Sequence, residues 1–250
     1  MKPFIPLVLS FAVAAVCLSG CGSPAASPSS APASTVSASA AESSKASTKQ
    51  IALEATTQGD YNTLALSFSQ LVEDADAILR IQVQQTEPFV NENGMLQTKI
   101  TPLVEEVYKG SFQDEPLYVN GGEMLYEEWS QYPQVTAMME GHEPPDGGQG
   151  YAGQYVRQVV DGQSIPQPGE SYIFFVKHRE DTGAAYPLYA YQGIFKLVDG
   201  MMENAALSLD EPLALDLYTL FVNPEAPATL STQVTVPQEA FVQQLTDLAC

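Results

Sequence analysis

The segment Ser171–Lys177 reads SYIFFVK. Its centre, residues 172–176, is an unbroken run of aromatic and aliphatic side chains, and the turn signal Pro168–Gly169–Glu170 comes directly before it. A short apolar run without polar alternation, bounded by a turn, is typical of a strand that is buried on both faces. We therefore expect Ser171–Lys177 to be the central strand of the core.

Three further strands are predicted upstream of this run. In Ala77–Phe89 apolar residues alternate with polar ones, which indicates a strand with one buried face. The Asn91–Gly94 turn leads into a second strand, Leu96–Tyr108, where Pro102 predicts an edge or a bulge. Leu117–Val119 forms a short third strand.

Downstream, Leu188–Val198 is predicted to be a strand in which Gly193 marks a bulge or a close approach of two backbones. Asp199–Gly200 is a hairpin signal that leads into the strand Met201–Ala206. The stretch Leu207–Val236 has no pattern that decides between helix and strand.

Helical spacing of apolar residues predicts a helix at each end of the folded region, Tyr61–Asp74 and Pro237–Leu248. Short antiparallel strands leave exposed edges unless the sheet closes on itself. We therefore expect a mainly β (α+β) fold, in which a small antiparallel β-barrel is flanked by an N-terminal and a C-terminal helix.

A long insertion, residues 123–167, interrupts the strands and is rich in proline and glycine. Irregular loops of this length inside a domain are uncommon and are often functional. Its aromatic residues argue against simple disorder, so we take them as candidate binding residues. They are Tyr126, Trp129, Tyr132, Tyr151 and Tyr155.

The N-terminus has the parts of a secretory lipoprotein signal. Lys2 supplies the positive start, Phe4–Leu18 the apolar run, and Ser19 and Gly20 are small residues directly before Cys21. The run of roughly 15 apolar residues is shorter than the ~20 that a membrane-spanning helix needs. We predict that Cys21 is lipidated and holds the protein on the extracytoplasmic face of the cell membrane.

Three regions follow from this interpretation. Residues 1–20 are the signal peptide, and residues 21–49 are the lipidated cysteine and a tether rich in Ser, Ala and Pro. Such a tether buries too little apolar surface to fold, so we expect it to be disordered. Residues 50–250 form a single domain that carries the insertion.

The charge of the chain limits its partners. With 10 basic and 30 acidic residues the formal net charge is −20, which argues against nucleic-acid binding, because phosphate contacts need clustered Lys and Arg. Cys17 leaves with the signal peptide and Cys21 carries lipid, so Cys250 is the remaining thiol and no intramolecular disulfide forms.

No catalytic or metal-binding motif is present in the sequence. His142 and His178 have no Cys or second His at ligand spacing, and no nucleophile-elbow motif occurs. The acidic residues of the insertion lack EF-hand spacing, so a solvated loop is favoured over a calcium site. These are Glu127, Glu128, Glu140, Glu143 and Asp146. We predict no catalytic residue, no metal, no cofactor and no enzyme activity.

Four motifs occur in succession: LVEDADAI at 71–78, VYKG at 107–110, the pair Gly121–Gly122, and PGESYIFF at 168–175. Together they resemble a group of uncharacterised lipoproteins of Gram-positive bacteria, over roughly Leu64–Val198. The resemblance implies a small OB-like barrel of the metalloproteinase-inhibitor (TIMP-like) type, and no catalytic residues. Inhibition through a disulfide-held N-terminal cysteine is not expected, because Cys21 is acylated and separated from the domain by the tether.

The sequence therefore predicts a membrane-anchored extracytoplasmic lipoprotein that acts as a binding or interaction module, with a ligand or protein partner that the sequence does not identify. One alternative is a cell-envelope hydrolase that uses Asp and Glu residues around the insertion. A buried carboxylate pair with raised pKa values would favour the hydrolase. Another alternative is a calcium-binding or ligand-binding accessory subunit.

Overall fold

The computed structural model of the protein describes residues 49–59, 63–113, 115–140, 148–221 and 234–249. All of these residues belong to one compact unit that begins at Lys49. The predicted signal peptide, Cys21, the tether as far as residue 48, and Cys250 lie outside the described residues.

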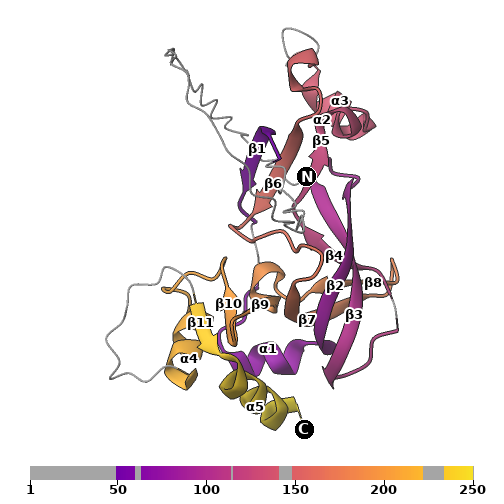
Figure 1. The fold of residues 1–250 in the computed structure, drawn as a ribbon. Coiled ribbons are helices and arrows are strands. Elements are labelled where there is room, and N and C mark those ends of the chain that lie inside the picture. Colours follow the sequence, from indigo (N-terminus) through magenta and orange to yellow (C-terminus); the bar gives the residue numbers. More distant parts are fainter. Residues whose placement is uncertain (1–48, 60–62, 114, 141–147, 222–233, 250) are drawn as a thin grey trace, which may run out of the picture. The chain divides into compact units, whose positions relative to one another are not determined.

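Most strands belong to one eight-stranded mixed sheet (Figure 1). In spatial order its strands are β11 (Val234–Pro237), β10 (Met201–Asn204), β9 (Ile194–Val198), β7 (Ser171–Arg179), β2 (Ala77–Val90), β3 (Leu96–Lys109), β4 (Leu117–Asn120) and β8 (Ala184–Pro187).

One part of this sheet curls into a ring, because β8 pairs with two strands. It pairs antiparallel with β7 along its whole length and parallel with β4 where Leu117 lies opposite Ala185. Strands β7, β2, β3, β4 and β8 form the ring, which is partly closed, since β4 and β8 meet at a single register pair. The chain is a mixed α+β protein, as expected, and the ring departs from the expected antiparallel arrangement at the parallel pairing of β4 with β8.

Strand β7 is buried on both faces, as its sequence predicts. Tyr172, Phe174 and Val176 point into the ring and pack against apolar residues of β2, β3, β4 and β9. Ile173 and Phe175, which alternate with them, join a second core beneath the helices. Each of these five side chains is at most 2% exposed, so β7 carries apolar contacts on both sides.

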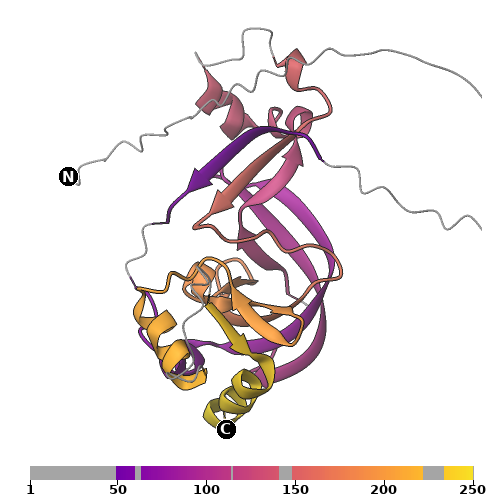
Figure 2. The ribbon, with the colours of Figure 1, turned by 60° about the vertical axis from the view of Figure 1, so that its left-hand side comes forward.

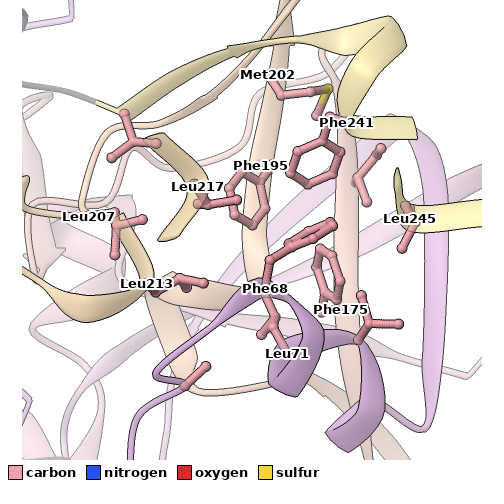
Figure 3. Packing of buried hydrophobic residues seen from close by; sticks show 14 of the residues in the cluster. Phe68, Leu71, Phe175, Phe195, Met202, Leu207, Leu213, Leu217, Phe241 and Leu245 are labelled. Atoms are coloured by element: carbon pink, nitrogen blue, oxygen red, sulfur yellow. The ribbon is translucent and has the colours of Figure 1, made fainter. Parts of the chain in front are cut away.

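Three helices cover the second face of β7: α1 (Phe68–Asp74), α4 (Pro212–Phe221) and α5 (Gln238–Ala249). Figure 3 shows the aromatic side chains Phe68 of α1 and Phe241 of α5 beside Phe175 and Phe195 of the sheet. The ring centroids of Phe68 and Phe241 are 4.8 Å apart. Phe241 also packs against Phe195 on β9, with centroids 4.9 Å apart. No helix in the described residues is long and apolar enough to cross a bilayer.

The predicted strands Ala77–Phe89 and Leu96–Tyr108 and the C-terminal helix are confirmed, and the Pro102 signal marks a register shift opposite Val83 of β2. The predicted strand Leu188–Val198 is correct only from Ile194 onward, because residues 190–193 form a 3₁₀ turn. The first helix is shorter than expected, because Ser67 caps it by accepting a hydrogen bond from the amide of Gln70 at 3.2 Å. It does not open the domain, since strand β1 (Ile51–Thr57) comes before it.

The insertion is not the irregular loop that we expected. It contributes β5 (Gly122–Leu125) and β6 (Tyr155–Val160), which form a three-stranded sheet with β1 in the order β1-β6-β5. Figures 1 and 2 show β1 beside β6, and the two strands run parallel. This sheet and the short helices α2 (Tyr126–Trp129), α3 (Pro133–Met139) and η1 (Gln149–Tyr151) are called the cap below.

The connection between β6 and β7, residues 161–170, is called the strap and is the part of the insertion that stays irregular. Its last residues are fixed to β2: Gly169 N–H donates to the Val83 carbonyl at 2.8 Å, and Val83 N–H donates to the Glu170 carbonyl at 2.9 Å. One further turn of 3₁₀ helix, η2 (Ala190–Gly193), joins β8 to β9.

We predict that Phe175→Ala lowers the free energy of unfolding by about 3–5 kcal/mol, because it opens a cavity between β7 and the helices. Leu103→Ala, at a position on β3 that is 45% exposed, should cost less than about 1 kcal/mol. Urea unfolding of both variants measures the difference, and equal losses would contradict a core centred on β7.

Candidate functional site

The structure brings together four of the five predicted binding residues. Tyr126 on α2 lies next to Tyr151, with ring centroids 5.0 Å apart, and next to Trp129, at 5.9 Å. Tyr132 joins the same apolar cluster, whose buried members include Val135 and Val156. Tyr126 is only 6% exposed, so this residue holds the cap together. Trp129, Tyr132 and Tyr151 keep half-buried faces.

Two close approaches keep η1 against α2. Gly148 has a φ of +83°, and a Cβ at this position would lie 2.6 Å from the ring of Tyr126, so only glycine fits. Glu127 accepts a hydrogen bond from the amide of Gly153 at 2.6 Å. The carboxylate of Glu127 therefore has a structural partner.

Tyr155, the fifth predicted residue, is not part of this apolar cluster. The ammonium of Lys49 is 5.0 Å from its ring centroid and 3.0 Å from a carboxylate oxygen of Glu123. Arg157 contacts the same carboxylate at 2.6 Å. Burial raises the pKa of Glu123, but hydrogen bonds from Lys49 and Arg157 outweigh burial and hold that pKa below its usual range. These contacts fix the chain at the start of β1.

The predicted acidic residues form no metal site in the described part of the chain, where no group of three or more potential ligands is close enough to hold an ion. Glu143, Asp146 and His142 lie outside the described residues. His178 lies at the end of β7, where its Nδ1 is 2.9 Å from Glu115 and its backbone N–H donates to Asp76.

A site that the sequence did not indicate lies between the strap and the β9–β10 hairpin. It is a cavity of about 160 Å³, called the hairpin pocket below. The floor of the pocket is one face of the β9–β10 hairpin. Ile194 on this face also belongs to the apolar core inside the ring, so the pocket adjoins the ring interior. The residues that line the pocket are Gln163, Ser164, Tyr172, Ile194, Lys196, Glu203, Asn204, Ala205 and Ala206.

A partly buried polar network lies beside this pocket, and two of its members, Tyr172 and Lys196, line the pocket. Lys196 forms a short ion pair with Glu170, and Glu170 also accepts hydrogen bonds from the Tyr172 hydroxyl at 2.6 Å and the Gln167 amide at 2.9 Å. Burial acts to raise the pKa of Glu170, but these donors, led by Lys196, outweigh it and lower the pKa. Burial and the neighbouring Glu170 carboxylate raise the pKa of Tyr172.

Gln163 of the strap lines both the hairpin pocket and a second cavity of about 80 Å³. The second cavity is otherwise lined by Tyr118, Asn120, Tyr186, Pro187 and Ala190. The strap begins at Asp161, whose backbone N–H donates to the carbonyl of Thr57 on β1 at 2.9 Å.

The turn before β9 is strained. Tyr189 and Ala190 both have φ near +52°, a left-handed conformation that costs a residue with a Cβ about 1 kcal/mol or more. The Tyr189 hydroxyl holds this turn by donating to Asp74 on the C-terminal turn of α1 at 2.5 Å. Ala190 lines the second cavity, so the strained backbone lies beside that cavity. Strain of this kind is concentrated at functional sites.

One sequence signal could have placed Lys196 and Glu203 side by side on the pocket floor, although no such pairing was predicted from the sequence. The Asp199–Gly200 hairpin is confirmed, and a two-residue turn sets Lys196 opposite Glu203. Polar residues at matching positions of two otherwise apolar strands indicate a shared polar face. No sequence signal indicated that Gln163 and Ser164 line the pocket, because an irregular segment has no periodic pattern of apolar and polar residues.

Two comparisons with known proteins give no match for the sequence. No protein-family model matches the chain, and no match is found among curated proteins. The resemblance to Gram-positive lipoproteins therefore stays a prediction.

We predict that Glu170→Gln lowers the free energy of unfolding by about 1–3 kcal/mol at pH 7, because Lys196 and the Tyr172 hydroxyl lose a charged partner. A carboxylate with a lowered folded-state pKa stabilises the protein above the unfolded-state value, here about 4.5, and this contribution is lost as the pH falls through the folded-state pKa.

The difference between wild type and Glu170→Gln should therefore shrink below about pH 4.5, as measured by urea unfolding across the pH range. Glu180→Gln, at an exposed position on the far end of β7, is the matched control and should differ little from wild type. A Glu170→Gln difference that stays constant down to pH 3 would contradict the assignment.

Proposed function

We propose that the chain is a membrane-anchored extracytoplasmic lipoprotein whose folded domain is a binding module for a small polar ligand. The proposal combines two lines of support. The sequence before Cys21 has the composition of a lipoprotein signal. The domain that begins at Lys49 has a cavity lined by several polar side chains, three of which form no hydrogen bond or ion pair within the described residues.

The hairpin pocket is the observation that carries the proposal. Within the described residues, the side chains of Gln163, Ser164 and Glu203 make no hydrogen bond or ion pair, although all three line the pocket. Convergent polar groups on a partly apolar, concave surface are typical of ligand sites. Ile194 and the methyl groups of two alanines supply the apolar part.

We also propose that the ring is an OB-like barrel, as the resemblance implies. Support comes from β8, which pairs with both β4 and β7, and from the apolar side chains that fill the ring interior. Ligands commonly bind at the mouths of small barrels. The hairpin pocket adjoins the interior of the ring, because Tyr172 and Ile194 belong to the ring core and also line the pocket.

A hydrolase receives less support from the same residues. A general acid needs a carboxyl group with a raised pKa, whereas the pKa of Glu170 is lowered by its donors. Glu203 lies opposite Lys196 on the adjacent strand. A binding role accounts for both carboxylates without a chemical step.

The anchor is tested by replacing the cysteine. We predict that Cys21→Ala moves the protein from the membrane fraction to the soluble extracytoplasmic fraction, because it removes the acylated thiol. Cys17→Ala, within the predicted signal peptide, is the matched control and should leave the protein in the membrane fraction. Retention of Cys21→Ala at the wild-type level would contradict the anchor.

The binding role is tested by ¹H–¹⁵N NMR titration of residues 49–250 with a panel of small polar metabolites of up to about ten non-hydrogen atoms. At least one should shift the amides of Ser164, Lys196 and Glu203 together. Ala205→Phe should abolish these shifts by filling the pocket, while Ala137→Phe on the exposed face of α3 should not. Shifts confined to the cap, or none across the panel, would contradict the proposed site.

A further inference from the structure

Glu203 is the charged side chain of the hairpin pocket that forms no ion pair within the described residues. Its neighbour Met202 turns the opposite way and is buried in the helix-covered core, so the Glu203 side chain lies on the pocket face of β10. It is half-buried, and within the described residues its carboxylate accepts no hydrogen bond and forms no ion pair. A partly buried carboxylate without a partner loses part of its hydration and gains no compensating hydrogen bond.

Lys196 does not neutralise Glu203, although the two residues lie directly opposite each other on β9 and β10. The Lys196 ammonium instead contacts Glu170, which is also held by the Tyr172 hydroxyl and the Gln167 amide. Lys196 and Glu170 thus balance each other. The pocket keeps one uncompensated negative charge, which attracts a cation and disfavours an anion.

The size and the other groups of the pocket restrict that cation. A volume of about 160 Å³ is close to the ~150 Å³ cavity that holds one benzene molecule, so the ligand has few non-hydrogen atoms. An ammonium group has three donors, and the pocket offers acceptors in the Glu203 carboxylate, the Ser164 hydroxyl and the Gln163 amide oxygen. Ile194, Ala205 and Ala206 fit a short aliphatic chain.

We propose that the hairpin pocket takes a small primary amine, whose ammonium group pairs with Glu203 and whose short aliphatic chain packs on Ile194, Ala205 and Ala206. This inference rests on the proposed function, because it names the ligand class of the same pocket. The amine replaces the missing partner of Glu203 and leaves the Lys196–Glu170 pair in place.

Three probes with one carbon skeleton and different charges test the inference: 4-amino-1-butanol, 1,4-butanediol and 4-hydroxybutanoate. Each is titrated into residues 49–250 by ¹H–¹⁵N NMR at 150 mM NaCl, which screens binding to the general negative charge. The amine should shift the amides of Ser164, Lys196 and Glu203. The diol should bind at least about tenfold more weakly, and the anion should not bind.

Glu203→Gln should weaken amine binding about tenfold or more, because it removes the charge and keeps the shape. Glu180→Gln removes the same charge at the far end of β7 and should change the affinity by less than about twofold. The melting temperature of each variant shows whether it is folded, and Ser164→Ala is a second pocket variant, expected to weaken the amine severalfold.

Equal binding of the amine and the diol, unchanged affinity in Glu203→Gln, equal losses in both glutamine variants, or no binding of the amine would each overturn the assignment. The metabolite panel separates this failure from failure of the proposed function. If an uncharged or anionic metabolite still shifts Ser164, Lys196 and Glu203, the pocket is a binding site and only the amine assignment is wrong.

Discussion

The structure depends on the burial of β7 on both faces. A strand in an antiparallel sheet commonly has one face in water, but here the ring interior takes Tyr172, Phe174 and Val176 while the helices take Ile173 and Phe175. Neither core is complete without β7. The ring needs it to meet β8, and the helices need its aromatic side chains to pack against.

The position of the pocket follows from the same strand. β7 pairs with β2 on one side and β9 on the other, so β9 places Lys196 beside Tyr172. The strap must return to the start of β7, which brings Glu170 to the same point. The polar network of Glu170, Lys196 and Tyr172 is therefore built where a buried strand begins. Glu203 is added by the adjoining hairpin and stays without a partner in the described residues.

The cap links the start of the domain to the strap. β1 joins the domain through Lys49, Glu123 and Tyr155, and the last residue of β1, Thr57, bonds to Asp161 at the start of the strap. The predicted aromatic residues give the cap its apolar core, and a binding role for their half-buried faces stays a prediction.

Much of the fold could be predicted where one strong period acts over a long segment. The apolar run of β7, the alternation in β2 and the stripe of α5 each leave one arrangement that buries the apolar residues. The cap was missed because α2, α3 and η1 are too short to show a period, and β1 because its partner β6 lies about a hundred residues away. The pocket combines a hairpin with an irregular strap, so only its Lys196–Glu203 floor was within reach of the sequence.

Native-state hydrogen exchange of residues 49–250 tests the central role of β7 most directly. If both cores depend on this strand, the amides of Ile173, Phe174, Phe175 and Val176 exchange only through global unfolding, with opening free energies equal to the free energy of unfolding from urea. Amides of the cap and α5 should open at lower free energy. Exchange of the β7 amides through a local opening, while either core stays protected, would contradict the account.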